Sequence, residues 1–204
     1  MYYPTTEKRK KPRIPGPGPK LVFPCGFFYG ASAKSGGIGF SLHLNETHSF
    51  EFVVGVGQWT NTKAKLVGLW ALLLSTHMMG IPSLQVFGDS SVIINWAKGK
   101  SSLSPLELHY WCRETRKLYT YFLALSFDHI YREHNQLADH LSKVALTLAP
   151  GSGTYSEFLD GHLTSHGNIK LFWVGAGIYI PFILAPLYGA GSFSLLIICL
   201  SCTR

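Results

Sequence analysis

Apolar residues in the central part of the chain form runs whose lengths are typical of strands followed by a helix. Residues 21–29, 36–44 and 49–56 are three short apolar runs, and the polar stretch Asn-Glu-Thr-His between the last two predicts a hairpin turn. Short connections favour antiparallel pairing of these strands. Residues 63–79 are apolar on almost every side and are followed by Gly80, which predicts a buried central helix that ends at a glycine.

The same alternation continues to about residue 148. Further strands are predicted over residues 83–87 and 124–131, and further helices over residues 90–98, 105–123 and 135–148, the last capped by Asn135. The order is three strands, a helix, a strand, two helices, a strand and a helix. It predicts an α/β fold with a mixed five-stranded sheet, three antiparallel strands followed by parallel additions, flanked by helices.

The segments outside this region have different compositions. A chain of 204 residues can form one ordinary core with room for tails, and the predicted elements place that domain at residues 21–149. Residues 1–20 are basic and Pro-rich, and their Pro-Gly alternation predicts a disordered, extended arm. The loop-like composition of residues 150–168 predicts a linker.

An apolar tail occupies residues 169–204, and its stretch 171–203 contains no charged residue and no histidine. The stretch is long enough to span a bilayer, which takes about 20 apolar residues, although Pro181 and Pro186 weaken a single continuous helix. Three interpretations stay open for it: a membrane anchor, a tail translated out of its original reading frame, and an apolar extension packed on the domain.

The net charge of +7 at pH 7 indicates a polyanionic partner, either nucleic acid or an anionic membrane surface. Residues 8–13 resemble a nuclear localisation run, although a solubilising arm explains them as well. The basic N-terminus lacks the apolar core of a secretory signal, so we expect an intracellular protein of the nucleus or cytoplasm, with membrane anchoring through the tail as the alternative. Four scattered cysteines are too few for a disulfide framework.

Four motifs occur in the order found in one known family. The stretches are FFYGAS at residues 27–32, TNTKAKLVGLWAL at 60–72, LQVFGDSSVIINWAKG at 84–99 and FDHIYREHNQLADHLSKVAL at 127–146. Over about residues 24–148 the chain resembles the ribonuclease H family, and most of all the reverse-transcriptase-like ribonuclease H domains of plant retroelements. The resemblance implies metal-dependent cleavage of the RNA strand of an RNA–DNA hybrid, with two Mg²⁺ or Mn²⁺ ions held by four carboxylates.

Two of the four implied carboxylates are replaced in this sequence. The third and fourth positions are Asp89 and Asp139, whereas the first is Tyr29 and the second is Lys65. A neutral phenol is a weak ligand for Mg²⁺, which prefers hard oxygen ligands. Lys65 adds a cation, whose repulsion of a unit charge at 4 Å is about 4 kcal/mol and roughly doubles for a divalent ion. Lys65 could instead pair with Asp89, so we expect impaired metal binding and absent or very weak catalysis.

Each of these positions also has an ordinary structural explanation. Asp89 before Ser90 fits a helix cap, and Asp139 in the first turn of a helix is favoured by the helix dipole. Tyr29 fits an ordinary strand residue, and Lys65 a solvated charge on its helix. The four-motif pattern favours remnants of a metal site. His129 and His134 lie near Asp139 in the sequence, and we expect both to be structural or exposed.

Several residues are candidates for contacts with nucleic acid. The resemblance implies a basic helix that holds the hybrid backbone through phosphate and 2′-OH contacts, which read shape and not sequence. The candidates are Ser32, Asn61, Lys98, Lys100, Arg113, Arg116 and Lys117. A solvated basic helix face explains the last three nearly as well.

Three hypotheses for function follow from these observations. The first is a retroelement-derived ribonuclease H-like domain that binds RNA–DNA hybrids but has lost turnover. The second is an active hybrid ribonuclease that uses Asp89 and Asp139 with substituted ligands. The third is a membrane-anchored interaction protein that uses the fold as a scaffold. None of them requires a small-molecule cofactor, and the sequence does not fix the oligomeric state.

Overall fold

A computed structural model of the chain describes residues 17–170, 172–174 and 177–179. Most of the basic arm and most of the apolar tail lie outside these residues, so the expectations for the arm, for the localisation run at residues 8–13 and for a membrane anchor stay predictions. Residues 172–174 and 177–179 form the two short antiparallel strands β8 (Phe172–Val174) and β9 (Gly177–Tyr179). Within the described residues, no helix combines the length and apolar character that crossing a bilayer requires.

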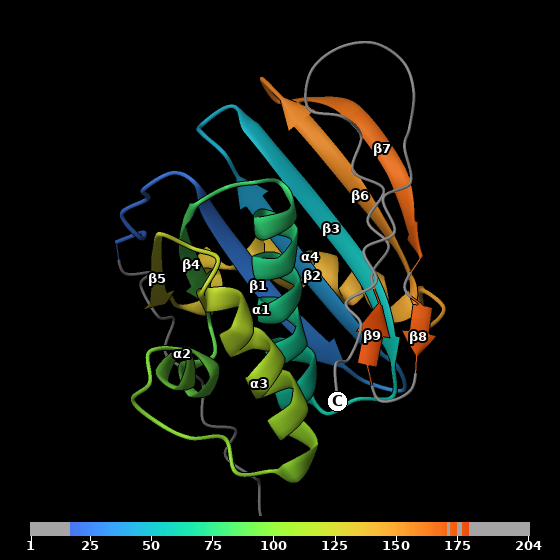
Figure 1. The fold of residues 1–204 in the computed structure, drawn as a ribbon. Coiled ribbons are helices and arrows are strands. Elements are labelled where there is room, and N and C mark those ends of the chain that lie inside the picture. Colours follow the sequence, from blue (N-terminus) through green and yellow to red (C-terminus); the bar gives the residue numbers. More distant parts are fainter. Residues whose placement is uncertain (1–16, 171, 175–176, 180–204) are drawn as a thin grey trace, which may run out of the picture.

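One mixed sheet organises the described domain (Figure 1). Its strands are β1 (Cys25–Ser32), β2 (Gly36–His43), β3 (His48–Gly57), β4 (Ser83–Gly88), β5 (Ala124–His129), β6 (Ser152–Leu159) and β7 (His162–Lys170). Their order across the sheet is β5-β4-β1-β2-β3-β6-β7. The first three strands pair antiparallel, and β4 and β5 add parallel to β1. The predicted α/β class and strand directions are therefore confirmed.

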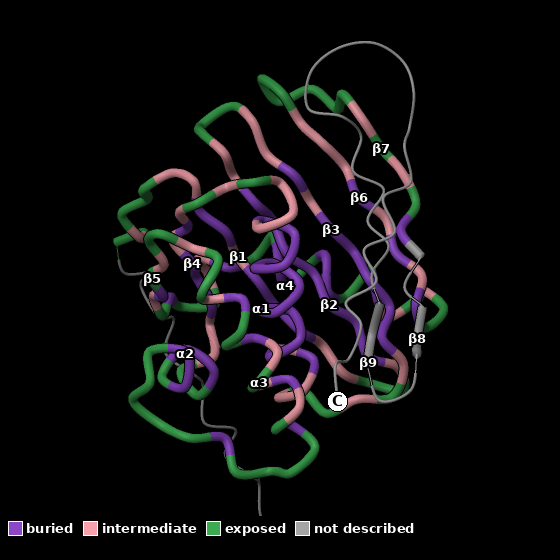
Figure 2. Tube along the Cα trace, in the orientation of Figure 1, coloured by how far each residue is buried: buried purple, intermediate pink, exposed green. Residues whose placement is uncertain are grey.

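Helices cover both faces of this sheet. They are α1 (Asn61–Met78), α2 (Ser91–Ala97), α3 (Leu106–Tyr119) and α4 (Gln136–Val144), with short 3₁₀ turns at Arg132–His134 and Ala145–Thr147. Figure 1 shows α1, α2 and α3 on one side of the sheet and α4 on the other. Because α1 lies between the sheet and α3, it is buried along most of its length, as Figure 2 shows. This explains why its sequence is apolar on almost every side.

Two glycines let the helices approach the centre of the sheet closely. A Cβ atom on Gly30 of β1 would lie 2.2 to 2.5 Å from backbone atoms of Ala64 and Lys65 in α1. A Cβ atom on Gly39 of β2 would lie 2.3 Å from the backbone nitrogen of Ser142 in α4. Such distances are far inside van der Waals contact, so both positions require glycine. The two contacts bring both helices to the middle of the sheet, where β1 and β2 pair.

The expected linker over residues 150–168 is wrong, because this segment forms the hairpin β6–β7 and extends the predicted five strands to seven. Strand β6 pairs antiparallel with residues 48–54 of β3. The turn is Asp160-Gly161, in which both residues have positive φ, 51° and 77°. A two-residue turn with positive φ at both positions matches the right-handed twist of the strands on either side of it. Asp-Gly is one of the sequences that favours such a turn. The Asp-Gly turn was missed because the residues around it are mostly polar and small, as in a loop.

Other predicted boundaries shift by a few residues. Helix α3 ends at Tyr119 and not at residue 123, because Thr120 caps it and the backbone N–H of Leu123 donates to the carbonyl of Pro82. Helix α4 ends at Val144 and continues only as a 3₁₀ turn, so its predicted extent to residue 148 is too long. Apolar residues directly after the C-terminal end of each helix led the sequence analysis to extend both helices too far.

Replacing Gly30 by Ala should destabilise the domain by about 1 to 3 kcal/mol, because the added methyl group meets backbone that cannot move aside like a flexible side chain. Denaturant unfolding of both proteins measures the difference. Gly18→Ala is the matched control, since a Cβ atom at Gly18 would meet nothing within 4 Å. Equal destabilisation by the two substitutions would contradict a tight contact between β1 and α1.

Candidate functional site

The four motif positions meet at one place in the fold. Tyr29 lies in β1, and the residue before it, Phe28, pairs with Gly88 at the end of β4. Asp89 follows Gly88 directly, so it lies close to Tyr29 across the two strands. Lys65 comes from the second turn of α1, and Asp139 from the first turn of α4. The structure thus brings together side chains from two strand positions and two helices, as the motifs predicted.

Local interactions fix the elements that carry these side chains. The Thr60 side chain caps α1 by accepting a hydrogen bond from the backbone N–H of Lys63. Asn135, at the start of α4, donates from Nδ2 to the carbonyl oxygen of Phe28 at 3.1 Å. This second bond ties α4 to β1 one residue before Tyr29, so the elements that carry Asp139 and Tyr29 are joined directly beside the site.

Lys65 is the centre of the first half of the site. Its Nζ lies 3.2 Å from Oδ1 of Asp89 and 4.3 Å from the centroid of the Tyr29 ring. The side chain of Asp89 is 9% exposed and that of Lys65 is 19% exposed, so water screens this pair only partly. The pairing of Lys65 with Asp89, weighed from the sequence, is present. An ammonium group thus lies between a remaining acid and the tyrosine that replaces another.

Two further cations hold Asp139 in the second half of the site. Nη2 of Arg132 lies 2.9 Å from Oδ1 of Asp139, and Nζ of Lys143 lies 2.6 Å from Oδ2. The guanidinium carbon of Arg132 is also 5.7 Å from the centroid of the Tyr29 ring, so Arg132 links Asp139 to Tyr29. Both carboxylate oxygens of Asp139 are therefore engaged by positive groups.

These contacts set the protonation of Asp139. Burial alone would raise the pKa of its carboxyl group, but the hydrogen bonds from Lys143 and Arg132 and their charges outweigh it, so the pKa lies below the ordinary value of 3.8. The pKa of Arg132 is raised, first by its hydrogen bond to Asp139 and then by the negative charge of the same carboxylate. The pair is therefore ionised throughout the physiological range.

The residues present do not fit the two metal ions that the motifs imply. Among the described residues, no group of three or more His, Cys, Asp or Glu side chains converges on a point where it could hold a metal ion. The two remaining acids already have cationic partners at hydrogen-bonding distance. A divalent ion would have to displace Lys65 from Asp89 and both Arg132 and Lys143 from Asp139.

Sequence reasoning missed Arg132 and Lys143. The signal for Lys143 was present, because it follows Asp139 by four residues on the same helix, where opposite charges meet. Arg132 lies in the 3₁₀ turn before α4, and only the folded chain shows that it reaches back to Asp139. His129, expected to be structural or exposed, is exposed, and its Nε2 lies 3.1 Å from the backbone carbonyl of Asp89.

The candidate nucleic-acid contacts lie on four separate segments of the chain. Ser32 donates from Oγ to the carbonyl of Trp59, and Asn61 is exposed at the start of α1. Lys98 and Lys100 are exposed after α2, where Nζ of Lys98 lies 3.4 Å from Oδ1 of Asp128.

The basic face of α3 is exposed but partly neutralised. Nε of Arg113 and Nζ of Lys117 lie 3.1 and 3.0 Å from Oε1 of Glu114. The guanidinium carbon of Arg116 is 5.3 Å from the ring centroid of Trp96, which connects α3 to α2. The three cations therefore share one surface, and one acid reduces its charge.

Comparison with solved structures gives the class of the fold. Ribonuclease H1 from the halophilic archaeon Halobacterium salinarum is 26% identical, with a TM-score of 0.57, and the match covers 60% of this chain and 96% of that one. LC11-RNase H1, isolated from compost by a metagenomic approach and solved in complex with an RNA/DNA hybrid, is 22% identical, with a TM-score of 0.56 and coverage of 60% and 95%. A ribonuclease H domain from Mycobacterium tuberculosis is 20% identical, with a TM-score of 0.55 and coverage of 60% and 93%.

The fold of this chain is therefore the ribonuclease H fold. Residues 47–145 match the model of the family described as reverse transcriptase-like, and they contain Lys65, Asp89 and Asp139. The resemblance of this part of the chain to the ribonuclease H family, drawn from the motifs, is therefore confirmed. No curated protein matches the sequence.

Replacing Asp139 by Asn should change how stability depends on pH. A carboxyl group whose pKa is lowered by folding stabilises the folded state above its unfolded pKa, about 3.8, and this contribution is lost as the pH falls through the lower folded pKa. The Asn variant should therefore be less stable than the wild type near neutral pH, and the two should converge in acid. Denaturant unfolding from pH 2 to 7 measures both curves, and parallel curves would contradict the ion pairs at Asp139.

Proposed function

We propose that this chain contains a ribonuclease H-like domain of retroelement origin that binds RNA–DNA hybrids without cleaving them. The observation that supports this most is the position of Lys65, whose ammonium group contacts Asp89 and the Tyr29 ring where the motifs imply carboxylates around metal ions. The retroelement origin rests on the match of residues 47–145 to the reverse transcriptase-like family.

The charge of the site supports binding of a phosphate in place of a metal ion. Two carboxylates, Asp89 and Asp139, face three cationic groups, Lys65, Arg132 and Lys143. The cluster carries a net charge of about +1, whereas the same cluster with carboxylates at positions 29 and 65 would carry about −2. A site of this sign repels Mg²⁺ and attracts the backbone of a nucleic acid. The fixed cations supply part of the charge that metal ions would otherwise bring.

The same substitutions explain why we expect no turnover. Hydrolysis with two metal ions needs one ion to activate a water molecule and one to stabilise the leaving oxygen. An ammonium or guanidinium group supplies charge and hydrogen bonds, but it does not hold a water molecule as a hydroxide nucleophile. Tyr29 is 9% exposed and packs under two cations, so it offers no carboxylate in compensation.

The class of ligand is inferred from the fold and from the basic surface. LC11-RNase H1, which shares this fold, was solved with an RNA/DNA hybrid. Such duplexes are recognised through backbone phosphates and 2′-hydroxyl groups, which requires exposed cations and not base-specific contacts. The exposed face formed by Arg113, Arg116 and Lys117 of α3 fits that role, with Ser32 and Asn61 as hydrogen-bonding groups nearer the site.

Hybrid binding should not require a divalent metal. The full chain should bind a fluorescent RNA–DNA hybrid with the same affinity in EDTA and in Mg²⁺ at matched ionic strength, measured by fluorescence anisotropy. The affinity should fall steeply with salt as counterions are released, and replacing Arg113, Arg116 and Lys117 by Ala should reduce the salt slope by about one to three units. Exposed Lys20→Ala is the control and should leave the slope unchanged.

Two results would count against this binding mode. A requirement for Mg²⁺ would mean that the site still takes up metal ions despite Lys65. An unchanged salt slope in the triple variant would remove α3 from the binding surface.

Restoring the missing carboxylates should restore cleavage. The wild type should show no Mg²⁺-dependent cleavage of hybrid above background, and Tyr29→Asp or Lys65→Glu alone should recover little. The double variant Tyr29→Asp with Lys65→Glu rebuilds four carboxylates, so its activity should exceed the product of the single effects, because residues that act as a unit are non-additive. A gel assay with labelled RNA measures cleavage, and adding Asp89→Asn should abolish it again.

The same assay separates the alternatives. Wild-type cleavage that is lost on Asp89→Asn would establish an active ribonuclease and overturn the proposal. A folded double variant that binds hybrid but does not cut it would show that Arg132 and Lys143, which occupy both oxygens of Asp139, also block the site. Adding Arg132→Gln to the double variant tests that block directly.

A further inference from the structure

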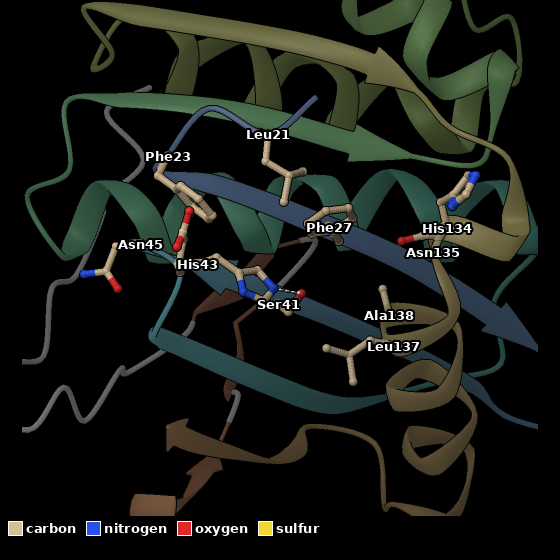
Figure 3. A pocket seen from close by; sticks show the side chains of 11 residues that line it. Leu21, Phe23, Phe27, Ser41, His43, Asn45, His134, Asn135, Leu137 and Ala138 are labelled. Carbon is tan, nitrogen blue, oxygen red and sulfur yellow. Dashed lines mark hydrogen bonds between the residues drawn. The ribbon is translucent and has the colours of Figure 1, made fainter. Parts of the chain in front are cut away.

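A pocket of about 410 Å³ lies on the α4 side of the sheet (Figure 3). Ser41 and Asn135 on its walls are 0% and 1% exposed, so neither presents a donor or an acceptor to a ligand there. Exposed polar groups are found instead at the carboxylate–cation site, which consists of Tyr29, Lys65, Asp89, Arg132, Asp139 and Lys143.

Two exposed cations form the outer edge of the carboxylate–cation site. The side chain of Arg132 is 60% exposed and that of Lys143 is 56% exposed, whereas that of Lys65 is 19% exposed. Each of the outer two contacts one carboxylate oxygen of Asp139. A guanidinium group has five N–H donors and an ammonium group three, so both keep donors for a phosphate that approaches from solvent.

An aromatic pair borders the same site. The rings of His129 and Tyr131 meet edge to face, with centroids 6.2 Å apart. Nε2 of His129 lies 3.1 Å from the backbone carbonyl oxygen of Asp89, which places the pair on the Asp89 side of the site. Arg132 follows Tyr131 directly and reaches Asp139. Tyr131 is 57% exposed, and an edge-to-face contact covers at most one face of its ring.

The segment that carries Tyr131 is fixed at both ends. Ile130 is 6% exposed, and its backbone N–H donates to the carbonyl oxygen of Gly88 at 3.0 Å. Asn135, drawn in Figure 3 at the start of α4, is buried and donates to the carbonyl oxygen of Phe28. Tyr131 therefore lies on a short loop that is anchored to β4 and to β1. Such anchoring reduces the conformational entropy lost when a ligand binds.

An exposed aromatic ring beside cations suits a nucleotide whose base is not paired. Within a duplex, neighbouring bases cover both faces of each base, so a protein side chain at the backbone meets sugars and phosphates. A base at a single-stranded end has a free face, which stacks on an aromatic side chain while its phosphate contacts cations. The position of Tyr131 beside Arg132 provides both interactions at one place.

We propose that the carboxylate–cation site binds an unpaired nucleotide at the end of an RNA–DNA hybrid, with its phosphate on Arg132 and Lys143 and its base stacked on Tyr131. The inference rests on the proposed hybrid binding, and it adds the single-stranded end as the preferred ligand. Every base has a face that stacks on an aromatic ring, so the preference is for an unpaired base and not for a sequence.

Two matched hybrids test the role of the base. In one, the DNA strand extends beyond the RNA strand by two deoxyadenosines at both ends; in the other it extends by abasic residues, which add the same phosphates without a base. Fluorescence anisotropy with the full chain in EDTA should show the adenosine hybrid binding about tenfold more tightly, because one base stacks on Tyr131. The ratio should be the same at low and high salt, because both hybrids carry equal charge. Equal affinity of the two hybrids would overturn the proposal.

Two exposed tyrosines provide a matched pair of variants. Tyr131→Ala should reduce the advantage of the adenosine hybrid to about twofold or less, and Tyr131→Trp should retain it. Tyr121 is 53% exposed and stacks on His77, with ring centroids 4.1 Å apart, at the opposite end of α1 from Lys65. Tyr121→Ala is therefore the control and should bind both hybrids as the wild type does. A full advantage in a folded Tyr131→Ala variant would place the base elsewhere and overturn the assignment.

A blunt hybrid separates this inference from the proposed function. Tight binding of the blunt hybrid with no advantage for the adenosine ends would overturn the inference and leave the proposed function standing. Weak binding of the blunt hybrid with a retained, Tyr131-dependent advantage would support the stacking site and count against the proposed function.

Discussion

The close contact between β1 and α1 at Gly30 determines the geometry of everything around the site. Because a hydrogen atom is the only side chain that fits there, the backbone of Ala64 and Lys65 lies directly against the strand. The backbone of Lys65 is thereby held against Gly30, the residue that follows Tyr29 in β1. From there its long side chain reaches both Asp89 and the ring of Tyr29. On the opposite face, Gly39 lets α4 approach in the same way and brings Asp139 to the sheet. A scaffold of this kind fixes where side chains meet but not which chemistry they perform.

Tyr29 and Lys65, at two of the four motif positions, change the electrostatics of the site more than its shape. In a site of four carboxylates, mutual repulsion is relieved by bound cations, so folding and metal binding support each other. Here the cations are part of the chain, and each remaining acid has partners at 2.6 to 3.2 Å. Both carboxylates are therefore neutralised by side chains of the protein, without a bound ion.

Much of the fold followed from periodicity, because the central strands and α1 bury continuous apolar faces. The hairpin β6–β7 did not, since its residues are mostly polar and its pairing with β3 depends on a neighbour far away in the sequence. The end of α3 was misplaced because Tyr121, Phe122 and Leu123 continue an apolar run although the chain has already turned. In the site, the motifs located Tyr29, Lys65, Asp89 and Asp139. They could not reveal Arg132 or the ring contact between His129 and Tyr131, because both depend on distances that only folding sets.

The hairpin β6–β7 also decides which surface the sheet shows to other chains. Without it, β3 would be the outermost strand, and its ten residues include Phe50, Phe52 and Val54 with a row of unpaired backbone groups. Long apolar edges of this kind promote pairing between molecules. With the hairpin in place, the pairing partner of β6 is β7, a strand of largely polar sequence whose side chains are mostly exposed, as Figure 2 shows. A chain that ended before the hairpin, at about residue 149, would therefore lose this protection against self-association while keeping every residue of the site.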